Sequence, residues 1–235
     1  DVATYIPELG KADPELFGIA LVTSSGQLFE VGDSEHPFTI QSISKPLTFG
    51  MALEAFGADA VSRRVGVEPS GDAFNAISLQ PDTNRPHNPM INAGAITVTA
   101  LLHARYGRET FDLILERLSL AAGRPLSMDQ AVFESERRTG HRNRAIAHLL
   151  LNFGMVHDQA EEALDVYFRQ CAILVTCRDL GVIAATLANM GRNPLTGAPV
   201  FDVVSVRGML AIMFTCGMYD YSGEWAYRVG LPAKS

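Results

Sequence analysis

Lysine is scarce in this chain of 235 residues, whose 19 basic side chains include only Lys11, Lys45 and Lys234 as lysines. Arginine keeps its proton at any working pH, whereas a buried lysine can lose one. The sequence therefore offers few candidates for an amine that acts as a base, which makes the position of each lysine informative.

Cysteine is also rare, and Cys171, Cys177 and Cys216 form neither a Cys-x-x-Cys pair nor a metal-ligand spacing. An odd number without such spacing argues against a disulfide framework and predicts buried thiols in a reducing compartment. No charged segment followed by an apolar one opens the chain at Asp1, so we expect a cytoplasmic protein.

Long apolar runs and a surplus of positive charge are missing as well. The absence of an 18-residue uncharged apolar stretch argues against a membrane span. A net charge of -7 argues against a large nucleic-acid interface, because neutralising phosphates needs excess lysine and arginine. With 47% hydrophobic residues, the composition predicts a globular protein of one or two domains that acts on a small molecule.

The order of the predicted elements indicates an α+β fold. Short β-prone runs at 17–23 and 27–31 flank a Ser-Ser-Gly turn, which predicts a hairpin. The run at 225–231 is typical of a returning strand, so we expect a sheet built from both chain ends. Apolar spacing predicts helices at 42–56, 92–106, 110–122, 142–153, 158–171, 178–190 and 204–215.

One candidate site is the Ser-x-x-Lys motif formed by Ser42 and Lys45 at the predicted start of a helix. One helical turn places both side chains on the same face, where a desolvated lysine with a lowered pKa could take the serine proton. The helix N-terminus would face an oxyanion formed there. A capping serine beside an exposed lysine explains the pattern equally well.

Two further groups near the C-terminus carry possible chemistry. Tyr219 and Tyr221 lie in a glycine-flanked turn, and a phenol can relay protons if a cation lowers its pKa. Loop tyrosines more often pack with a solvated hydroxyl, and the terminal Lys234 and Ser235 would ordinarily form a solvated tail. Ser-x-x-Lys, a loop tyrosine and Lys-Ser nevertheless follow the order found in penicillin-binding proteins and β-lactamases.

Blocks of sequence spread over nearly the whole chain are more specific than these motifs. They include Gln-Ser-Ile-Ser-Lys-Pro at 41–46 and Pro-His-Asn-Pro-Met-Ile-Asn-Ala-Gly-Ala at 86–95. Together they closely resemble the serine-dependent glutaminases. The blocks are residues 5–9, 41–46, 68–71, 86–95, 134–136, 142–143, 175–177, 184–189, 216–220 and 230–235.

The resemblance implies an amidohydrolase that converts L-glutamine to L-glutamate and ammonia. It implies an acyl-enzyme on Ser42, activation by Lys45 and proton transfer by Tyr219, without a metal or another cofactor. It implies a homodimer or homotetramer. The substrate contacts carried over from the family are Tyr5, Ser42, Asn92, Glu136, Asn143, Tyr167 and Tyr219.

Each of these contacts also has a simpler interpretation. Asn92 could cap the helix that begins there. Glu136 lies in a charged run typical of a solvated face, Asn143 would pass as a surface residue, and Tyr167 would pass as core. Several prolines between Gly66 and Met90 predict a long functional loop. His87 is a tempting base in this proline-rich loop, but it is more typical of a structural residue if Lys45 is the base.

The resemblance also implies a single catalytic domain over 1–235 with a β-lactamase-like serine acyltransferase fold and a helical subdomain at about 58–190. Family members continue beyond Ser235 through a glycine-rich turn and further strands, so we expect the C-terminal strands to be absent from this chain. The second oxyanion donor would be absent with them. A penicillin-binding or β-lactamase-like acylase and a non-catalytic glutamine or glutamate-binding protein remain alternatives.

Overall fold

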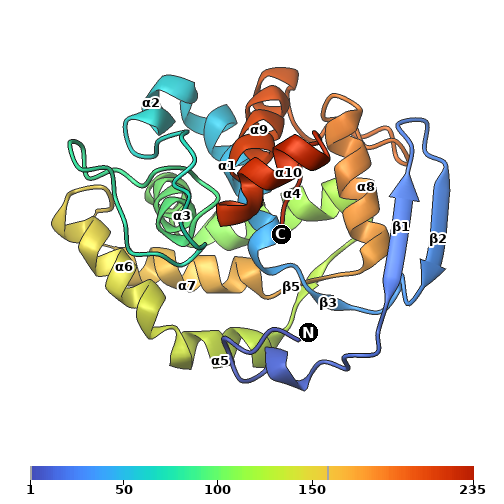
Figure 1. The fold of residues 1–235 in the computed structure, drawn as a ribbon, viewed down its shortest axis with the longest axis horizontal. Helices are drawn as coiled ribbons and strands as arrows, with labels where there is room; N and C mark the ends of the chain where they lie inside the picture. Colours follow the sequence, from blue (N-terminus) through green and yellow to red (C-terminus); the bar gives the residue numbers. More distant parts are fainter. Residues whose placement is uncertain (1, 158) are drawn as a thin grey trace. The chain divides into compact units, whose positions relative to one another are not determined.

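The computed structural model describes residues 2–157 and 159–235, which fold into two compact units (Figure 1). The expectations for Asp1 and for a helix start at Asp158 lie outside the described residues. The first unit contains the residues up to Gln41, Phe111–Gly140 and Phe168–Val203, and the second contains Ser42–Thr110, His141–Tyr167 and Val204–Ser235. Each unit thus combines three stretches distant in sequence.

The predicted N-terminal hairpin is confirmed. Strands β1 (Gly18–Val22) and β2 (Leu28–Gly32) pair antiparallel, and Leu21 lies opposite Phe29. Gly26 takes the turn position with φ 84°, which suits glycine. One face of the hairpin is apolar and open, because four of its side chains are 51–59% exposed: Ile19, Leu21, Phe29 and Val31.

Helix α8 (Cys177–Ala188) packs against β1, as Figure 1 shows. Gly181 allows this close approach, since a Cβ there would lie 2.9 Å from Cγ2 of Val22. A capping box fixes the start of α8, in which the Thr176 side chain and the Asp179 side chain each bond the other residue's backbone N–H. The Asp179 carboxylate also accepts a bond from Nε of Arg124 at 2.8 Å.

A second small sheet also lies in the first unit. It has the order β3 (Phe38–Thr39), β5 (Ile173–Val175) and β4 (Ser127–Met128), and both pairings are antiparallel. In the described part of the chain, no named strand follows Val175. The expectation of a sheet built from both chain ends is therefore wrong for these residues.

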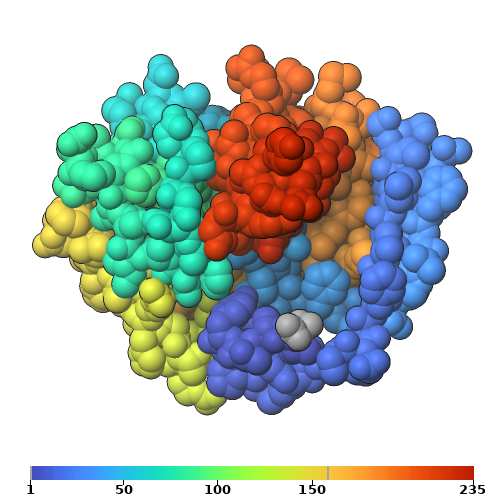
Figure 2. Space-filling view, viewed as in Figure 1, coloured from blue at the N-terminus to red at the C-terminus, as the bar shows by residue number. Residues whose placement is uncertain are grey.

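The segment predicted as a returning strand at 225–231 is instead mostly helical. Helix α10 (Ser222–Arg228) includes Trp225, whose backbone carbonyl accepts a bond from the N–H of Val229 at 2.8 Å. The indole Nε1 of Trp225 donates to the carbonyl of Leu231 at 2.8 Å, which folds the segment back on the helix. Figure 2 shows these last residues, coloured red, at the surface.

The first unit also contains a helix that the sequence did not predict. Helix α5 (Gln130–Thr139) begins after Asp129, whose carboxylate accepts a bond from the N–H of Val132 at 3.0 Å. Its charged stretch had indicated a solvated face, yet Ser135 and Glu136 are buried. The unit further contains η1 (Leu9–Lys11) and most of α4 (Thr110–Ala122), and the predicted bounds of α4 are confirmed.

The second unit is mainly helical, and α3 (Asn92–Tyr106) is its central helix. Residues 92–100 of α3 are all buried, and the helix packs against both α1 (Lys45–Phe56) and α6 (His141–Asn152). A helix buried on every side is expected to form a core. Other helices with residues in this unit include α10 and α2 (Ala58–Ser62), α7 (Ala160–Cys171), η3 (Gly107–Glu109), α9 (Val203–Cys216) and η4 (Tyr219–Tyr221).

Within the described residues, no single helix combines the length and apolar composition needed to cross a membrane. Helix α9 and residues 219–228 pass that test only together, as a pair bent by 83°. The cytoplasmic location, the single-domain organisation with its helical subdomain, and self-association into a homodimer or homotetramer stay predictions.

Candidate active site

Ser42 lies in a short 3-10 helix that leads directly into α1. This helix, η2, comprises Gln41–Ser44, and α1 begins at Lys45 rather than at Ser42 as predicted. Pro46 follows at the start of α1, where its missing N–H costs no intrahelical bond. Side chains three residues apart in a 3-10 helix eclipse each other. The tight turn therefore favours placing Ser42 and Lys45 on the same side.

Lys45 is only 1% exposed, which is unusual for a lysine. Its Nζ donates a hydrogen bond of 2.7 Å to Oδ1 of Asn92, at the start of α3. The alternative in which an exposed lysine follows a capping serine is therefore wrong. A buried cationic group needs polar partners, and Asn92 provides one.

Asn92 connects three of the predicted site residues. Its Oδ1 accepts from Lys45 and, at 3.4 Å, from Oη of Tyr167, while its Nδ2 donates to Oδ1 of Asn143 at 2.9 Å. Ile91 is the N-cap of α3, so the interpretation of Asn92 as a helix cap is wrong. Because the amide oxygen accepts and the amide nitrogen donates, these bonds determine the orientation of the Asn92 amide group.

Asn143 and Tyr167 are both buried. The interpretation of Asn143 as a surface residue is thus wrong, whereas Tyr167 is 2% exposed and does lie in the core. The phenol hydroxyl of Tyr167 nevertheless donates a hydrogen bond to Asn92. Burial in the core and a role at a polar site are compatible for tyrosine, since one end of its ring is polar.

Tyr219 lies beside two lysines. Nζ of Lys45 is 5.5 Å from the centroid of its ring, and Nζ of Lys234 is 4.0 Å from it. Lys234 also donates a hydrogen bond of 2.6 Å to Oη of Tyr219. The ring of Phe74, from the predicted proline-rich loop, lies 5.6 Å away. The amines of both lysines thus lie close to this phenol.

The backbone around Tyr219 is closely fitted. Tyr219 has φ 57°, a left-handed conformation that costs a bulky residue energy and often occurs at functional sites. At Gly217, an added Cβ would lie 1.8 Å from the carbonyl oxygen of Ala233. The N–H of Ser235 donates to the Gly217 carbonyl at 3.3 Å. Glycine at 217 thus lets the final residues approach this turn.

Burial, followed by the charge of Lys45, lowers the pKa of Lys234 well below its usual value. Between that lowered pKa and the unfolded value, the unfolded chain binds more protons than the folded one. We therefore expect the free energy of unfolding to rise with pH across that interval, by at most about 1.4 kcal/mol per pH unit from this group. Denaturant unfolding at a series of pH values measures this rise.

The matched variants for this measurement are Lys234→Met and Lys11→Met. Lys11 is exposed and paired with Glu8, so Lys11→Met should keep the pH dependence of the wild type. Lys234→Met should flatten it. Parallel curves for the wild type and Lys234→Met would contradict the assignment.

Tyr5 and Glu136 belong to the first unit. Tyr5 is 52% exposed, and its Oη donates to Oε1 of Gln41 at 2.9 Å. Gln41 in turn donates from Nε2 to Oγ1 of Thr39 at 2.9 Å, and it immediately precedes Ser42 in the chain. Glu136 is 4% exposed in α5, so the interpretation of a solvated face is wrong for this residue.

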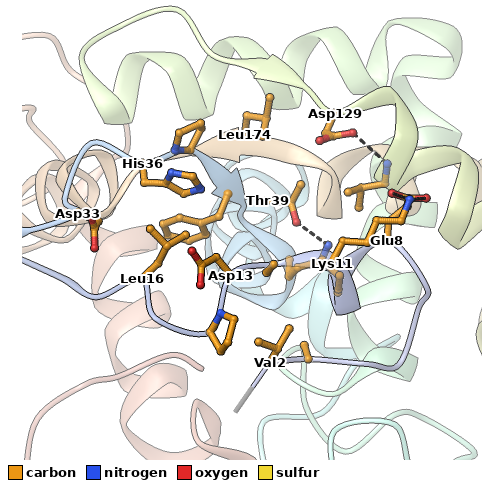
Figure 3. A pocket seen from close by; sticks show the side chains of 18 of the residues that line it. Val2, Glu8, Lys11, Asp13, Leu16, Asp33, His36, Thr39, Asp129 and Leu174 are labelled. Atoms are coloured by element: carbon orange, nitrogen blue, oxygen red, sulfur yellow. Dashed lines mark hydrogen bonds and ion pairs between the residues drawn. The ribbon is translucent and has the colours of Figure 1, made fainter.

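A pocket of about 800 Å³ in the first unit includes Tyr5 and Gln41 in its wall. Figure 3 shows its polar side, with Lys11 paired to Glu8 and with Thr39 and Asp129 held in hydrogen bonds. Asp129 caps α5, the helix that carries Glu136.

Three residues near the predicted site had only weak signals in the sequence. A lysine at position 234 would ordinarily belong to a solvated tail. The scarcity of lysine in the chain was the feature that drew attention to it. Phe74 and Gln41 contact predicted site residues, and only their membership of the proline-rich loop and of the 41–46 block marked them. Within the described residues, no cluster of three His, Cys, Asp or Glu side chains could hold a metal.

Known proteins match the chain over its full length. The family model described as Glutaminase matches residues 1–235. A glutaminase from Nostoc sp. is 55% identical over all of the chain and 70% of that protein. The solved structure titled probable glutaminase ybaS has a TM-score of 0.96 and 41% identity, covering all of this chain and 76% of that one.

A solved structure of Mglu in its native form is also similar, with a TM-score of 0.94 and 46% identity over all of this chain. The match covers 57% of the Mglu chain. The chain thus spans roughly three fifths to three quarters of the similar proteins. Mixed helices with small antiparallel sheets are consistent with a β-lactamase-like fold.

Proposed function

The chain belongs to the glutaminase family of amidohydrolases, and from that membership we propose that it hydrolyses L-glutamine to L-glutamate and ammonia. One observation carries the mechanism: a lysine that is 1% exposed begins α1 one turn after Ser42 and lies 5.5 Å from the Tyr219 ring. Burial removes the water that would otherwise stabilise an ammonium group. Such an amine is suited to accept a proton from a neighbouring serine.

The proposed reaction has two halves. Oγ of Ser42 attacks the side-chain amide carbon of glutamine and passes its proton to Lys45. The carbon–nitrogen bond then breaks, Tyr219 gives a proton to the leaving nitrogen, and an ester of Ser42 remains. Water then attacks the ester and passes one proton to Tyr219, while Lys45 returns its proton to Oγ of Ser42 as glutamate is released. Over the cycle, one water is consumed and one ammonia is released.

Substrate recognition is proposed for the remaining residues. Glu136 would offer a carboxylate to the substrate ammonium, which is the stronger kind of hydrogen bond because both groups are charged. Asn92, Asn143, Tyr5 and Tyr167 would bond the substrate carboxylate and amide. The bond that Asn92 accepts from Lys45 and the bond that it donates to Asn143 support a fixed arrangement of donors and acceptors in the second unit.

The test is ammonia release from glutamine compared with asparagine at equal concentration. Asparagine has one methylene fewer, which would displace its amide from Ser42, so we expect at least about tenfold lower kcat/KM. A fluorescent penicillin is the second probe. Stable labelling of Ser42 without ammonia release would support an acylase, and thermal stabilisation by glutamine without turnover would support a binding protein. Either result would overturn the proposal.

A further inference from the structure

Asn88, in the proline-rich loop, is a buried polar residue that the proposed mechanism does not use. It is 1% exposed, and its side chain bonds three backbone groups. Oδ1 accepts from the N–H of Met90 at 3.0 Å and from the N–H of Ile91 at 3.3 Å. Nδ2 donates to the carbonyl of Glu68 at 2.9 Å. A side chain bonded to backbone groups on two sides fixes the path of the chain between them.

Two glycines let the backbone of this segment pack closely on both sides. A Cβ on Gly94 would lie 1.9 Å from the carbonyl oxygen of Asn88, and a Cβ on Gly66 would lie 2.6 Å from the carbonyl oxygen of His87. Backbones approach this closely only where a residue has no Cβ. The backbone of His87 and Asn88 is therefore held between Gly66 and the first turn of α3.

The bonds of Asn88 lie just before the start of α3, whose first residue is Asn92. Ile91 is the N-cap of α3 and has no polar side chain, so the turn in front of the helix takes its side-chain acceptor from Asn88. The N–H of Asn92 donates to the carbonyl of Phe74 at 2.8 Å. The amide oxygen of Asn92 then meets Nζ of Lys45 at 2.7 Å. The position of that oxygen depends on where α3 begins.

We propose that Asn88 is a positioning residue, which fixes the start of α3 and thereby holds the Asn92 amide oxygen against the Lys45 amine. The inference rests on the proposed function, in which that amine takes the proton of Ser42. Displacing a reacting group by about 1 Å can slow a reaction by about 10²-fold. Asn88 acts only through Asn92, and its own bonds stay unchanged through the cycle.

The kinetic test compares Asn88→Ala, Asn92→Ala and the double variant. Asn88→Ala leaves three backbone groups without their side-chain partner and should lower kcat by about 10- to 100-fold. KM should change by less than about threefold, because Asn92 is one of several proposed substrate contacts. The double variant should be no slower than Asn92→Ala alone, since Asn88 acts through Asn92. Losses that multiply in the double variant would overturn the proposal.

Asn88→Ser and Asn88→Cys form a matched pair that tests the acceptor itself. A serine hydroxyl accepts from backbone N–H groups in the same kind of turn, whereas a thiol of similar shape is a weak acceptor. Asn88→Ser should therefore recover most of kcat, and Asn88→Cys should remain slow. This comparison holds even if Asn88→Ala fails to fold, and equal kcat in the two variants would contradict the proposal. The control is Asn152→Ala, which changes the exposed last residue of α6 in the same unit and should leave kcat within about twofold.

A readout without substrate separates this inference from the proposed function. Because the chain contains only three lysines, NMR of protein isotopically labelled at lysine Cε gives few signals, and Lys45→Met identifies the one from Lys45. We expect Asn88→Ala and Asn88→Cys to move this signal toward its position in Asn92→Ala, while the Lys11 signal stays in place. Asn88→Ser and Asn152→Ala should leave the Lys45 signal near its wild-type position.

The two proposals can then fail separately. If the wild type releases no ammonia, the proposed function fails while the shifts of the Lys45 signal still show that Asn88 positions this amine. A Lys45 signal that neither Asn88→Ala nor Asn88→Cys moves would refute the role of Asn88, whatever the rate of ammonia release.

Discussion

Ammonia release from glutamine should fall by about 10⁴-fold or more in Ser42→Ala, as is typical when a catalytic serine is removed. Without Oγ no ester can form, so only uncatalysed attack by water remains. The structure places Ser42 in the turn that leads into α1, and the variant removes one oxygen from a half-buried side chain. The thermal midpoint should therefore change little. Initial rates of ammonia release and a thermal melt check both expectations.

Ser62→Ala is the matched control for the serine variant. Ser62 belongs to the same unit, and its hydroxyl donates to the carbonyl of Asp59 at 3.0 Å. Its loss should leave kcat within about twofold, because nothing places it at the site. Normal activity in Ser42→Ala would show that another group opens the amide.

Lys45→Met should lower kcat by about 10³-fold or more while the protein still binds glutamine. Methionine fills similar space without an amine, so the variant removes the proton acceptor and keeps most of the packing around a side chain that is 1% exposed. Oδ1 of Asn92 loses a bond of 2.7 Å, which should destabilise the fold by about 1–3 kcal/mol. Steady-state kinetics and denaturant unfolding measure the two effects separately.

Lys11→Met controls for the loss of a lysine as such, since Lys11 is exposed. It should match the wild type in rate and in stability within about 0.5 kcal/mol. Thermal stabilisation of Lys45→Met by glutamine would show that its site is still formed. Full activity in a folded Lys45→Met would mean that Ser42 is activated by a different base.

Helices with a repeating apolar face could be predicted from the sequence, and the chain end could not. The bounds of α3 and α4 agree with the predicted ranges because apolar periodicity and a following glycine marked them. Residues 225–231 alternate apolar side chains as a strand does, yet Tyr227 is 90% exposed and Leu231 61% exposed. The apolar side chains of this segment therefore alternate without being buried in a sheet. The local backbone hydrogen bonds of α10 determine its structure instead.

The site shows the same limit for polar residues. The position of Asn92 at a predicted helix start favoured a cap, because asparagine is common there. The long-range bond that its side chain accepts from Lys45 could not be predicted from that position. Glu136 looked solvated because charged residues surround it in sequence, whereas α5 turns its side chain inward. Whether a polar side chain is buried depends on contacts between residues far apart in the chain. Sequence periodicity does not predict those contacts.

The burial of Lys45 also affects how the protein reacts with reagents that acylate primary amines. Such a reagent reaches the Lys11 side chain, which is 70% exposed, and is kept from an amine that is only 1% exposed. Unfolding opens both to attack. The average number of lysine adducts per molecule therefore rises as the native population falls. Mass spectrometry of the labelled protein would thus measure the fraction of folded molecules.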